Sequence, residues 1–384
     1  MILGIDAFNI RAGGGVTHLV ELLRAAEPRA HDFRQVVIWA GQATLDKIDD
    51  RDWLRKVGDP LLERGLLHRM WWQRFRLCRL ATEAGCDVLF IPGGSDASGF
   101  RPLVTMSQNL LPFEWRELRR YGWSILTLKL LLLRWTQGRS FRRADGVVFL
   151  TNYARDAVLN VIARFQGKSL IVPHGINPRF TAPPRAQRAL VDFNKSHPCR
   201  LLYISIVDVY KHQWHVAEAV AQLRSEGLPV VLELVGPPAR GIGRLKNTLN
   251  RVDPQETFIN YRGAVPYEKL DTIYAAADIG VFASSCENMP NILLEGMAAG
   301  LPMACSEMGP MPEVLGDAGV YFNPEVVSSI AGVLRKLIKS ADLRLQVANA
   351  AFHRAQAFSW ERCASDTFGF LAKIAREAQA GSNL

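Results

Sequence analysis

The sequence predicts an α/β protein made of two domains, each built around a parallel sheet. Short apolar runs alternate with amphipathic segments along the whole chain, which is the pattern of repeated strand–helix–strand units. The length of 384 residues exceeds that of one typical domain. A Pro-rich segment without periodicity, Thr181 to Arg185, separates the two halves. A hydrophobic content of 48% with 22% charged residues is typical of a soluble globular protein.

The first domain is expected over residues 1–180. It opens with a buried strand, and a loop that contains Gly13, Gly14 and Gly15 follows before a helix from about residue 17. This order lets backbone N–H groups approach a phosphate, and a plain flexible turn explains three glycines equally well. The apolar runs predict strands at residues 1–6, 35–40, 87–92, 102–106, 146–150 and 169–173.

The second domain is expected over residues 181–358, with the same alternation of strands and helices. A last helix is expected from about residue 359 to residue 378. The cleft between two domains of this kind is where ligands should bind. The apolar runs predict strands at residues 199–205, 230–235, 258–263, 279–282 and 301–305.

One stretch, Ala283 to Pro302, carries the most specific signal. Pro290 suits the first position of a helix and Gly300 suits the position just past its end. The free N–H groups and the positive dipole end of such a helix suit a diphosphate. Glu287 precedes this point and Glu295 lies inside the helix, roughly 8 Å further along its axis. Each carboxylate can accept two hydroxyls, which describes a nucleotide sugar, although a solvated helix face with two ordinary acids has the same pattern.

The run from Glu287 to Glu295 resembles the E-x7-E motif of family-4 retaining glycosyltransferases. Residues 107–114 and 208–215 resemble the enzymes of bacterial surface-polysaccharide assembly. The segments 300–302 and 312–319 are similar to that family's pattern too. The resemblance covers most of the chain. It implies the GT-B fold, in which two Rossmann-like domains face a central cleft and the C-terminal helix, here residues 359–384, crosses back to the first domain.

The resemblance also implies the donor site. Glu287 and Lys211 take the catalytic roles, with Glu287 on the sugar hydroxyls, Glu295 on the ribose and Lys211 on the diphosphate. The family carries an Arg near this Lys, and here Ser205, Ile206 or Val207 stands in its place, so Arg240, Arg244 or Arg262 is expected to substitute. The donor-binding set implied is Gly14, Gly15, His174, Lys211, Gly236, Arg262, Gly263, Glu287, Asn288, Met289, Pro290, Asn291, Ile292 and Glu295.

The acceptor side departs from the family pattern. A His often follows the strand at residues 102–106 in the family, and Gln108 and Asn109 hold that place here. Neither amide is a base near neutral pH, so both are expected only to bind the acceptor side. His174 either contacts donor phosphate or holds the turn in which it lies.

The excess of positive charge lies almost wholly in the first half of the chain. Residues 1–172 carry 25 Lys and Arg against 17 Asp and Glu, and residues 173–384 carry 21 against 20. We expect an anionic membrane surface as the partner, and no nucleic acid, because no motif with base-reading spacing is present. Two Arg-rich segments, residues 61–83 and 116–143, also carry Trp, Phe and Leu. The apolar run 125–133 is too short to cross a bilayer but can lie on one, and a buried helix is the alternative.

The sequence therefore predicts a retaining hexosyltransferase that uses a GDP- or UDP-linked sugar, with no other cofactor and no metal. The acceptor is expected to be a saccharide or lipid-linked saccharide of surface polysaccharide assembly. The six cysteines lack metal or disulfide spacing, and the chain opens directly on a strand, so a cytoplasmic enzyme on the inner face of the membrane is expected. The alternatives are a sugar-nucleotide epimerase or hydrolase on the same fold, or a non-catalytic nucleotide-sugar-binding subunit.

Overall fold

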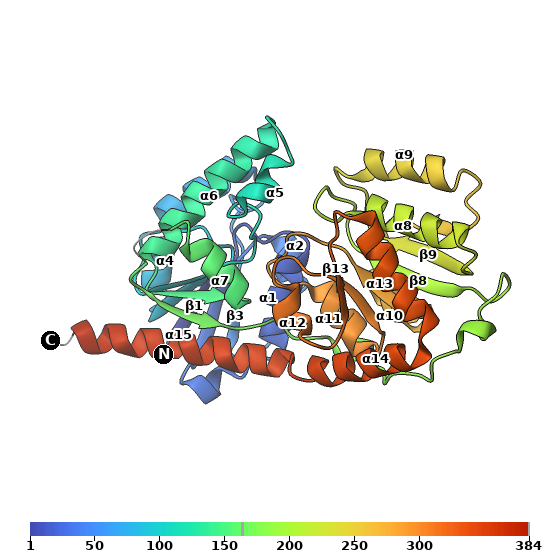
Figure 1. The fold of residues 1–384 in the computed structure, drawn as a ribbon. Helices are drawn as coiled ribbons and strands as arrows, with labels where there is room; N and C mark the ends of the chain where they lie inside the picture. The colour runs from blue at the N-terminus through green and yellow to red at the C-terminus, as the bar shows by residue number, and fades with distance from the viewer. Residues whose placement is uncertain (163–164, 383–384) are drawn as a thin grey trace. The chain divides into compact units, whose positions relative to one another are not determined.

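The structure is a computed structural model that describes residues 1–162 and 165–382. It divides into two compact units, each with one sheet. Unit 1 consists of Met1–Trp115, Trp123–Gly175 and the C-terminal segment from Ser359. Unit 2 consists of Arg116–Gly122 and Ile176–Phe358. The predicted α/β class with two Rossmann-like parallel sheets is confirmed (Figure 1).

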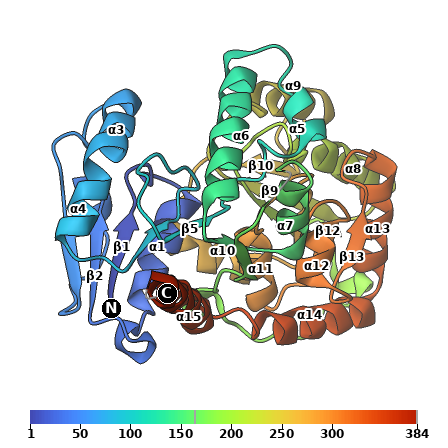
Figure 2. The ribbon, with the colours of Figure 1, turned by 90° about the vertical axis from the view of Figure 1, so that its left-hand side faces the viewer.

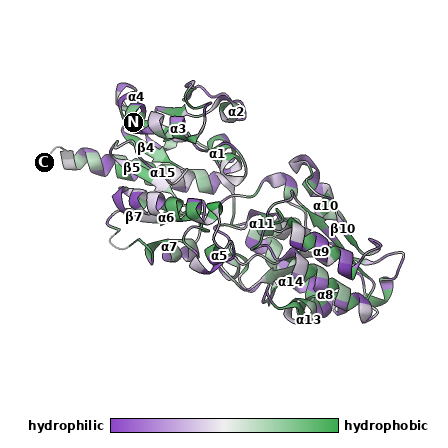
Figure 3. Ribbon diagram, turned by 90° about the horizontal axis from the view of Figure 1, so that it is seen from above, coloured by the Kyte–Doolittle hydropathy of each residue, from purple (hydrophilic) through white to green (hydrophobic). Residues whose placement is uncertain are grey.

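The sheet of unit 1 has seven parallel strands in the order β3-β2-β1-β4-β5-β6-β7. Helices cover both faces, so most strands are continuous apolar runs, and β4 and β5 are drawn mainly in the hydrophobic colour in Figure 3. The strands are β1 (Ile2–Asp6), β2 (Gln35–Trp39), β3 (Leu54–Val57), β4 (Val88–Ile91), β5 (Leu103–Met106), β6 (Gly146–Phe149) and β7 (Lys168–Ile171).

The C-terminal helix α15 (Trp360–Ser382) belongs to unit 1. It packs against α1, β4 and β6, and Figure 2 shows it end-on beside α1 (Gly14–Arg24). This confirms the predicted return of the last helix to the first domain. The other helices are α2 (Gln42–Leu45), α3 (Leu66–Trp72), α4 (Cys78–Glu83), α6 (Ile125–Arg143) and α7 (Asn152–Leu159), with a 3₁₀ turn at Pro28–His31 and a π-helical turn at Gln73–Leu77 between α3 and α4.

The sheet of unit 2 has six parallel strands in the order β10-β9-β8-β11-β12-β13. The strands are β8 (Cys199–Ile204), β9 (Val230–Val235), β10 (Ile259–Tyr261), β11 (Ile279–Phe282), β12 (Met303–Ser306) and β13 (Val320–Phe322). The helices are α8 (Gln213–Ser225), α9 (Ile242–Val252), α10 (Leu270–Ala276), α11 (Asn291–Ala298), α12 (Met311–Leu315), α13 (Val327–Lys339) and α14 (Ala341–Ala355), with 3₁₀ turns at Pro178–Phe180, Leu190–Asp192 and Tyr267–Lys269. The short helix α5 (Trp115–Arg119) lies almost wholly in the segment that joins this unit.

Some boundaries differ from those predicted. Helix α1 begins at Gly14 rather than near residue 17, because the glycine-rich loop itself forms the first turn. Pro290 is the N-cap of α11 and not its first helical residue. The edge strands β3 and β13 were not predicted, since both are short and only partly buried. The end predicted for the helix that is α7, Ala163, lies outside the described residues.

The strand order indicates where ligands are expected to bind in each sheet. In each sheet the order reverses next to the first strand, between β1 and β4 in unit 1 and between β8 and β11 in unit 2. The crevice beyond the carboxyl ends of such a strand pair is the usual binding place in open α/β sheets. The loops after these four strands are therefore the ones to examine. In the described ranges, every helix is too short or too polar to cross a bilayer.

Candidate functional site

The two residues given catalytic roles meet at the switch point of unit 2. Lys211 lies in the loop after β8 and Glu287 in the loop after β11, and the Lys211 ammonium forms an ion pair with the Glu287 carboxylate. Their side chains are 7% and 15% exposed. The Lys211 Nζ also lies 5.0 Å from the centre of the Tyr210 ring. A buried cation and a half-buried carboxylate thus stand together where a ligand of this sheet should bind.

A backbone hydrogen bond joins the two loops, and a tyrosine side chain of β8 holds the backbone of Lys211. The Ser285 N–H donates to the Tyr210 carbonyl at 2.8 Å, and the Tyr203 hydroxyl donates to the Lys211 carbonyl at 2.6 Å. His212 caps α8 in the left-handed conformation, with φ of 51°. The positions of the Lys211 and Glu287 side chains therefore depend on contacts made by their neighbours.

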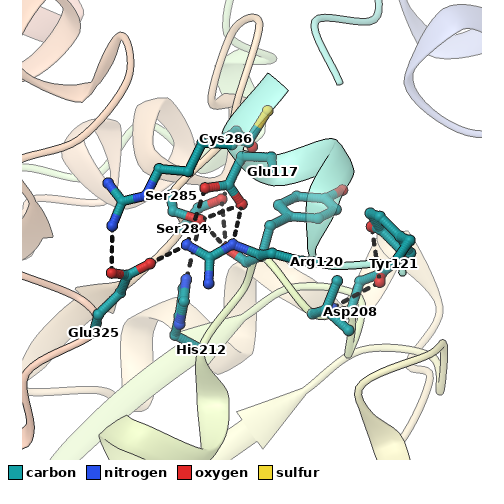
Figure 4. A network of polar contacts seen from close by, with 12 residues as sticks. Glu117, Arg120, Tyr121, Asp208, His212, Ser284, Ser285, Cys286 and Glu325 are labelled. Atoms are coloured by element: carbon teal, nitrogen blue, oxygen red, sulfur yellow. Dashed lines mark hydrogen bonds and ion pairs between the residues drawn. The ribbon is translucent and has the colours of Figure 1, made fainter. Parts of the chain in front are cut away.

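A segment from the first half of the chain completes this network, as Figure 4 shows. Glu117 is buried and its carboxylate accepts from Ser285 Oγ at 2.8 Å and from Arg120 Nε at 2.7 Å. Arg120 also pairs with Glu325, so one guanidinium lies between two carboxylates. The Tyr121 hydroxyl donates to Asp208 Oδ1 at 3.2 Å. The segment Arg116–Gly122 is thereby fixed to the loops that carry the candidate site.

His212 lies in the same network as a neutral group. Burial, with a further contribution from the Arg120 charge, lowers its pKa to about 3. Its Nε2 is 3.0 Å from Ser285 Oγ. A neutral ring that donates from Nε2, with the serine hydroxyl donating to Glu117, satisfies this chain of contacts.

The arginines expected to substitute for the missing cation have other contacts. Arg240 lies over the Tyr121 ring and Arg244 over the Trp214 ring, at 5.6 and 4.4 Å from the centroids. Arg262 pairs with Glu233 at 2.6 Å. Arg120 is instead the arginine that the structure brings to the loop of Ser285. It lies in the other half of the sequence, and no local pattern indicates its place.

The helix that follows Glu287 has an N-terminus suited to an anion. Pro290 is the N-cap, the first turn of α11 carries no acidic residue, and no side chain caps it. The N–H groups of Leu293 and Leu294 both bond to the Pro290 carbonyl, at 2.9 and 3.1 Å. The preceding Asn288 and Met289 are buried, and Asn291 and Ile292 are half-buried. The positive end of the dipole thus faces the loop of Glu287.

Glu295 lies inside α11 and is buried, as its predicted place in the helix requires. Its carboxylate accepts from the Tyr274 hydroxyl at 3.0 Å and from the Tyr267 hydroxyl at 3.3 Å. Burial raises the pKa of this carboxyl to about 7, against the opposing effect of the two tyrosine hydrogen bonds. Arg179 stacks on the Tyr267 ring at 3.8 Å. Both oxygens of this carboxylate thus accept a tyrosine hydroxyl in the structure.

The two glycines of unit 2 that were predicted to contact the donor, Gly236 and Gly263, lie where β9 and β10 end. The Gly236 N–H donates to the Gly263 carbonyl at 2.8 Å. A Cβ on Gly236 would lie 2.0 Å from the Ser205 carbonyl oxygen, and its φ of 146° also disfavours a side chain. Gly263 has φ of 70°. Both positions therefore require glycine for backbone reasons.

The predicted residues of unit 1 fall in three different surroundings. Gly14 and Gly15 form the first turn of α1, and Gln108 lies against Gly15. Asn109 is exposed and accepts from the Leu111 N–H at 3.1 Å, which closes its own turn. His174 is buried, with its ring 4.6 Å from that of His18 and 5.7 Å from Trp360. This stack accounts for His174 as a residue that holds its turn.

In residues 1–162 and 165–382, no group of three His, Cys, Asp or Glu side chains is arranged so that it could hold a metal ion. The six cysteines are free thiols. Cationic and backbone groups are therefore what these residues offer to an anionic ligand.

Comparison with known proteins gives two family matches in sequence order. A model described as Glycosyltransferase Family 4 matches residues 12–180, and one described as Glycosyl transferases group 1 matches residues 198–340. O-antigen chain mannosyltransferase B of Escherichia coli is 35% identical over 113 residues, which cover 29% of this chain and 30% of that protein. MMP alpha-(1->4)-mannosyltransferase of Mycolicibacterium hassiacum is 26% identical over 266 residues, which cover 65% and 61%.

The fold has relatives among solved structures. Sucrose-phosphate synthase from Thermosynechococcus elongatus matches with a TM-score of 0.76 at 16% identity, over 99% of this chain and 100% of that one. This likeness shows the fold. By contrast, the matched sequence spans about a third of the first curated relative and about three fifths of the second.

Proposed function

Because this chain belongs to the GT-B glycosyltransferases, with a family 4 domain followed by a group 1 domain, we propose that it transfers a hexose with retention of configuration. The donor is a nucleoside-diphosphate sugar. The acceptor is a saccharide or lipid-linked saccharide of surface polysaccharide assembly. The E. coli relative's name, an O-antigen chain mannosyltransferase, supports this acceptor class. We propose a GDP- or UDP-linked hexose as the donor.

The buried Lys211–Glu287 pair carries the proposal. When donor enters, Lys211 turns to the diphosphate and Glu287 accepts hydroxyls of the sugar, so each charge exchanges its partner for a substrate group. The N-terminus of α11 adds backbone N–H groups on the same anion. These groups stabilise the charge that develops on the leaving diphosphate, which is the role that a divalent ion has in other transferases.

The proton of the acceptor hydroxyl needs a base. Neither Gln108 nor Asn109 can serve, and His174 is packed in a ring stack. We assign this role to an oxygen of the donor phosphate. The acceptor oxygen then bonds to the anomeric carbon as the bond to the diphosphate oxygen breaks, on the same face of the sugar.

Unit 1 is proposed to attach to an anionic membrane surface on the cytoplasmic side. The basic excess lies in residues 1–172. Helix α6 also exposes Ile125, Leu128, Leu132 and Trp135, each between 60% and 75%, on one side. Such a stripe next to arginines is typical of a helix that lies in a membrane interface.

The first experiment is a thermal-shift panel with UDP, GDP, ADP and their common sugars. A ligand that binds only the folded protein raises the melting temperature. We expect a shift with one nucleoside diphosphate that is lost in Lys211→Ala and reduced in Glu295→Ala. No shift with any nucleotide would contradict the proposed donor.

Turnover separates the remaining alternatives. A transferase releases nucleoside diphosphate from its donor only when an acceptor is present, whereas a hydrolase or epimerase converts the donor alone. Glu287→Ala should bind nucleotide diphosphate nearly normally yet lose transfer. A non-catalytic subunit would show no turnover before or after this substitution.

A further inference from the structure

A buried arginine lies at the switch point of unit 1. Arg69, on α3, is 9% exposed, and its Nη1 donates to the Phe8 carbonyl at 3.2 Å and to Asn9 Oδ1 at 3.0 Å, both in the loop after β1. Its Nε is buried with no hydrogen-bond partner. Gln73 lies on the same side of the helix and donates to the Ser95 carbonyl, in the loop after β4, at 2.9 Å. This helix side therefore faces both loops of the switch point.

The charge of Arg69 is not neutralised by the protein. Among residues 1–162 and 165–382, its contacts are the two uncharged acceptors in the loop after β1. The neighbouring carboxyl, Asp6, accepts the Gln73 amide at 2.6 Å, and burial raises its pKa to about 7, so it supplies only part of a negative charge near neutral pH. Burial and the nearby positive charge of Arg11 lower the pKa of Arg69. A buried, uncompensated guanidinium costs stability, which favours a functional reason for it.

A purely structural role does not need this charge. The two hydrogen bonds that Arg69 makes to the loop are of a kind that a neutral amide side chain can also make. Arg11, in the same loop, is exposed, and within the part of the chain that the structure describes its ion pair is a long one with Glu63, 3.9 Å between charged atoms. Two arginines are thus held at one loop with little acidic compensation.

There is also room beside them. The loop ends at Gly13, which caps α1 without a side-chain hydrogen bond, and the first turn of α1 has no acidic residue. A Cβ on Gly13 or Gly14 would meet no atom of the described structure within 4 Å. The start of α1, in the same loop as Phe8, Asn9 and Arg11, is therefore open to a ligand.

We propose that Arg69 and Arg11 bind a phosphate group carried by the acceptor. This inference rests on the proposed function, because it assigns unit 1 to the acceptor, and it adds that the acceptor carries a phosphate group. The planar guanidinium fork matches phosphate oxygens in pairs, and bound phosphate would supply the missing negative charge. The phosphate can belong to a sugar phosphate or to a phosphorylated lipid.

The test measures phosphate binding with the donor site filled. The full-length protein is saturated with the nucleoside diphosphate that it binds, and then titrated calorimetrically with methyl phosphate, mannose 1-phosphate and geranyl phosphate. Methyl α-mannoside is the uncharged reference. The variants are Arg69→Gln, Arg69→Lys and Arg11→Gln, and the matched control is Arg74→Gln, an exposed arginine further along the same helical segment.

We expect all three phosphates to bind the wild type, and Arg69→Gln to weaken each of them at least about tenfold. Arg11→Gln should have a smaller effect, Arg69→Lys should keep part of the affinity, and Arg74→Gln none of these losses. Nucleotide affinity should stay the same throughout. Removing an uncompensated buried charge should also leave the melting temperature of Arg69→Gln equal or higher, whereas a structural arginine would lower it.

Two results would overturn the inference: no phosphate binding by the wild type, or equal phosphate affinity in the wild type, Arg69→Gln and Arg11→Gln. Preference for geranyl phosphate over mannose 1-phosphate identifies a lipid source, and the reverse preference identifies a sugar phosphate. A failure of the proposed function gives a different result. Nucleotide binding and sugar transfer would then be absent, whereas phosphate would still bind and would still depend on Arg69.

Discussion

Two charges with little exposure, the buried Lys211 and the half-buried Glu287, stabilise each other in the absence of substrate. Each would be costly alone, because a buried ion without its partner keeps the full desolvation penalty. The pair therefore has a structural role as well as the proposed catalytic one. A single substitution affects stability and catalysis together. A double substitution that removes both charges restores stability without restoring catalysis, and so separates the two roles.

We expect Lys211→Met to lower the free energy of unfolding by about 2 kcal/mol, because it leaves the half-buried Glu287 without its ion-pair partner. The double variant Lys211→Met/Glu287→Gln should recover most of that stability. Both proteins should lose transfer by about a hundredfold or more, since neither has the cation for the leaving diphosphate. Denaturant unfolding and initial transfer rates measure the two effects, and equal stability of the single and double variants would exclude the structural role.

Glu295 gives a prediction for pH. Its pKa of about 7 in the folded protein lies above the ordinary value of 4.5, so the folded state holds the proton more tightly than the unfolded state. Its contribution to stability is complete below about pH 4.5 and is lost as pH rises through about 7. Relative to Glu295→Gln, which does not titrate, the wild type should therefore lose up to about 3 kcal/mol between these limits.

Denaturant unfolding of both proteins at several pH values measures this difference. Asp6 has a raised pKa of similar size, but it is present in both proteins and cancels in the comparison. Glu268→Gln, at an exposed position, is the control and should differ from the wild type by a constant amount. A constant difference for Glu295→Gln as well would show that Glu295 titrates normally.

At the scale of elements, the segment Arg116–Gly122 is the least expected feature. It belongs to unit 2 although both its flanks belong to unit 1. Glu117 ties it to Ser285, two residues before Glu287, and Arg120 ties it to Glu325. The segment is thereby a positioning element for the loop that carries Glu287 (Figure 4).

We expect Glu117→Ala to raise the KM for donor about tenfold with a smaller fall in kcat, because Ser285 and Arg120 lose a shared acceptor and the loop loosens. Glu117→Gln keeps an acceptor oxygen and should recover part of the affinity. Glu268→Ala is the control at an exposed acidic position. An unchanged KM for donor in Glu117→Ala would show that the segment Arg116–Gly122 does not position the loop of Glu287.

The contrast between local and distant signals explains what the sequence could predict. Most of the strands and the helix after Glu287 follow from apolar runs and from the helix start and stop residues. The resemblance singled out Lys211 and Glu287 one by one, and the ion pair between them is a finding of the structure. The contact of Glu117 with Ser285 joins residues 168 positions apart, and side-chain chemistry in either segment does not indicate it. The tyrosine hydrogen bonds to Glu295 were missed for the same reason, since Tyr267 and Tyr274 read as ordinary helix residues.

At the scale of the whole molecule, the half of the chain with the excess of positive charge also carries a helix, α6, with exposed apolar side chains. The inner side of α6 is buried, with Leu130 and Phe141 in the core. Its outer side exposes Leu128, Leu132 and Trp135. A helix with apolar side chains on both sides needs an apolar partner on its outer side as well. Residues 1–172 carry 25 Lys and Arg against 17 Asp and Glu, which favours a partner that also has negative charge, such as an anionic membrane surface. Figure 3 shows both hydrophobic and hydrophilic colours along this helix.

We expect the protein to sediment with vesicles that contain anionic lipid at low salt, and less at high salt, because basic side chains add a screened attraction. The variant Leu128→Gln/Leu132→Gln/Trp135→Gln should reduce the partition coefficient about a hundredfold, if each side chain contributes about 1 kcal/mol on partial burial. The matched control is Val191→Gln/Leu345→Gln, which removes exposed apolar side chains from unit 2. Loss of a dimer in sedimentation velocity, with no vesicle binding by the wild type, would instead identify the stripe as a contact between two copies of the chain.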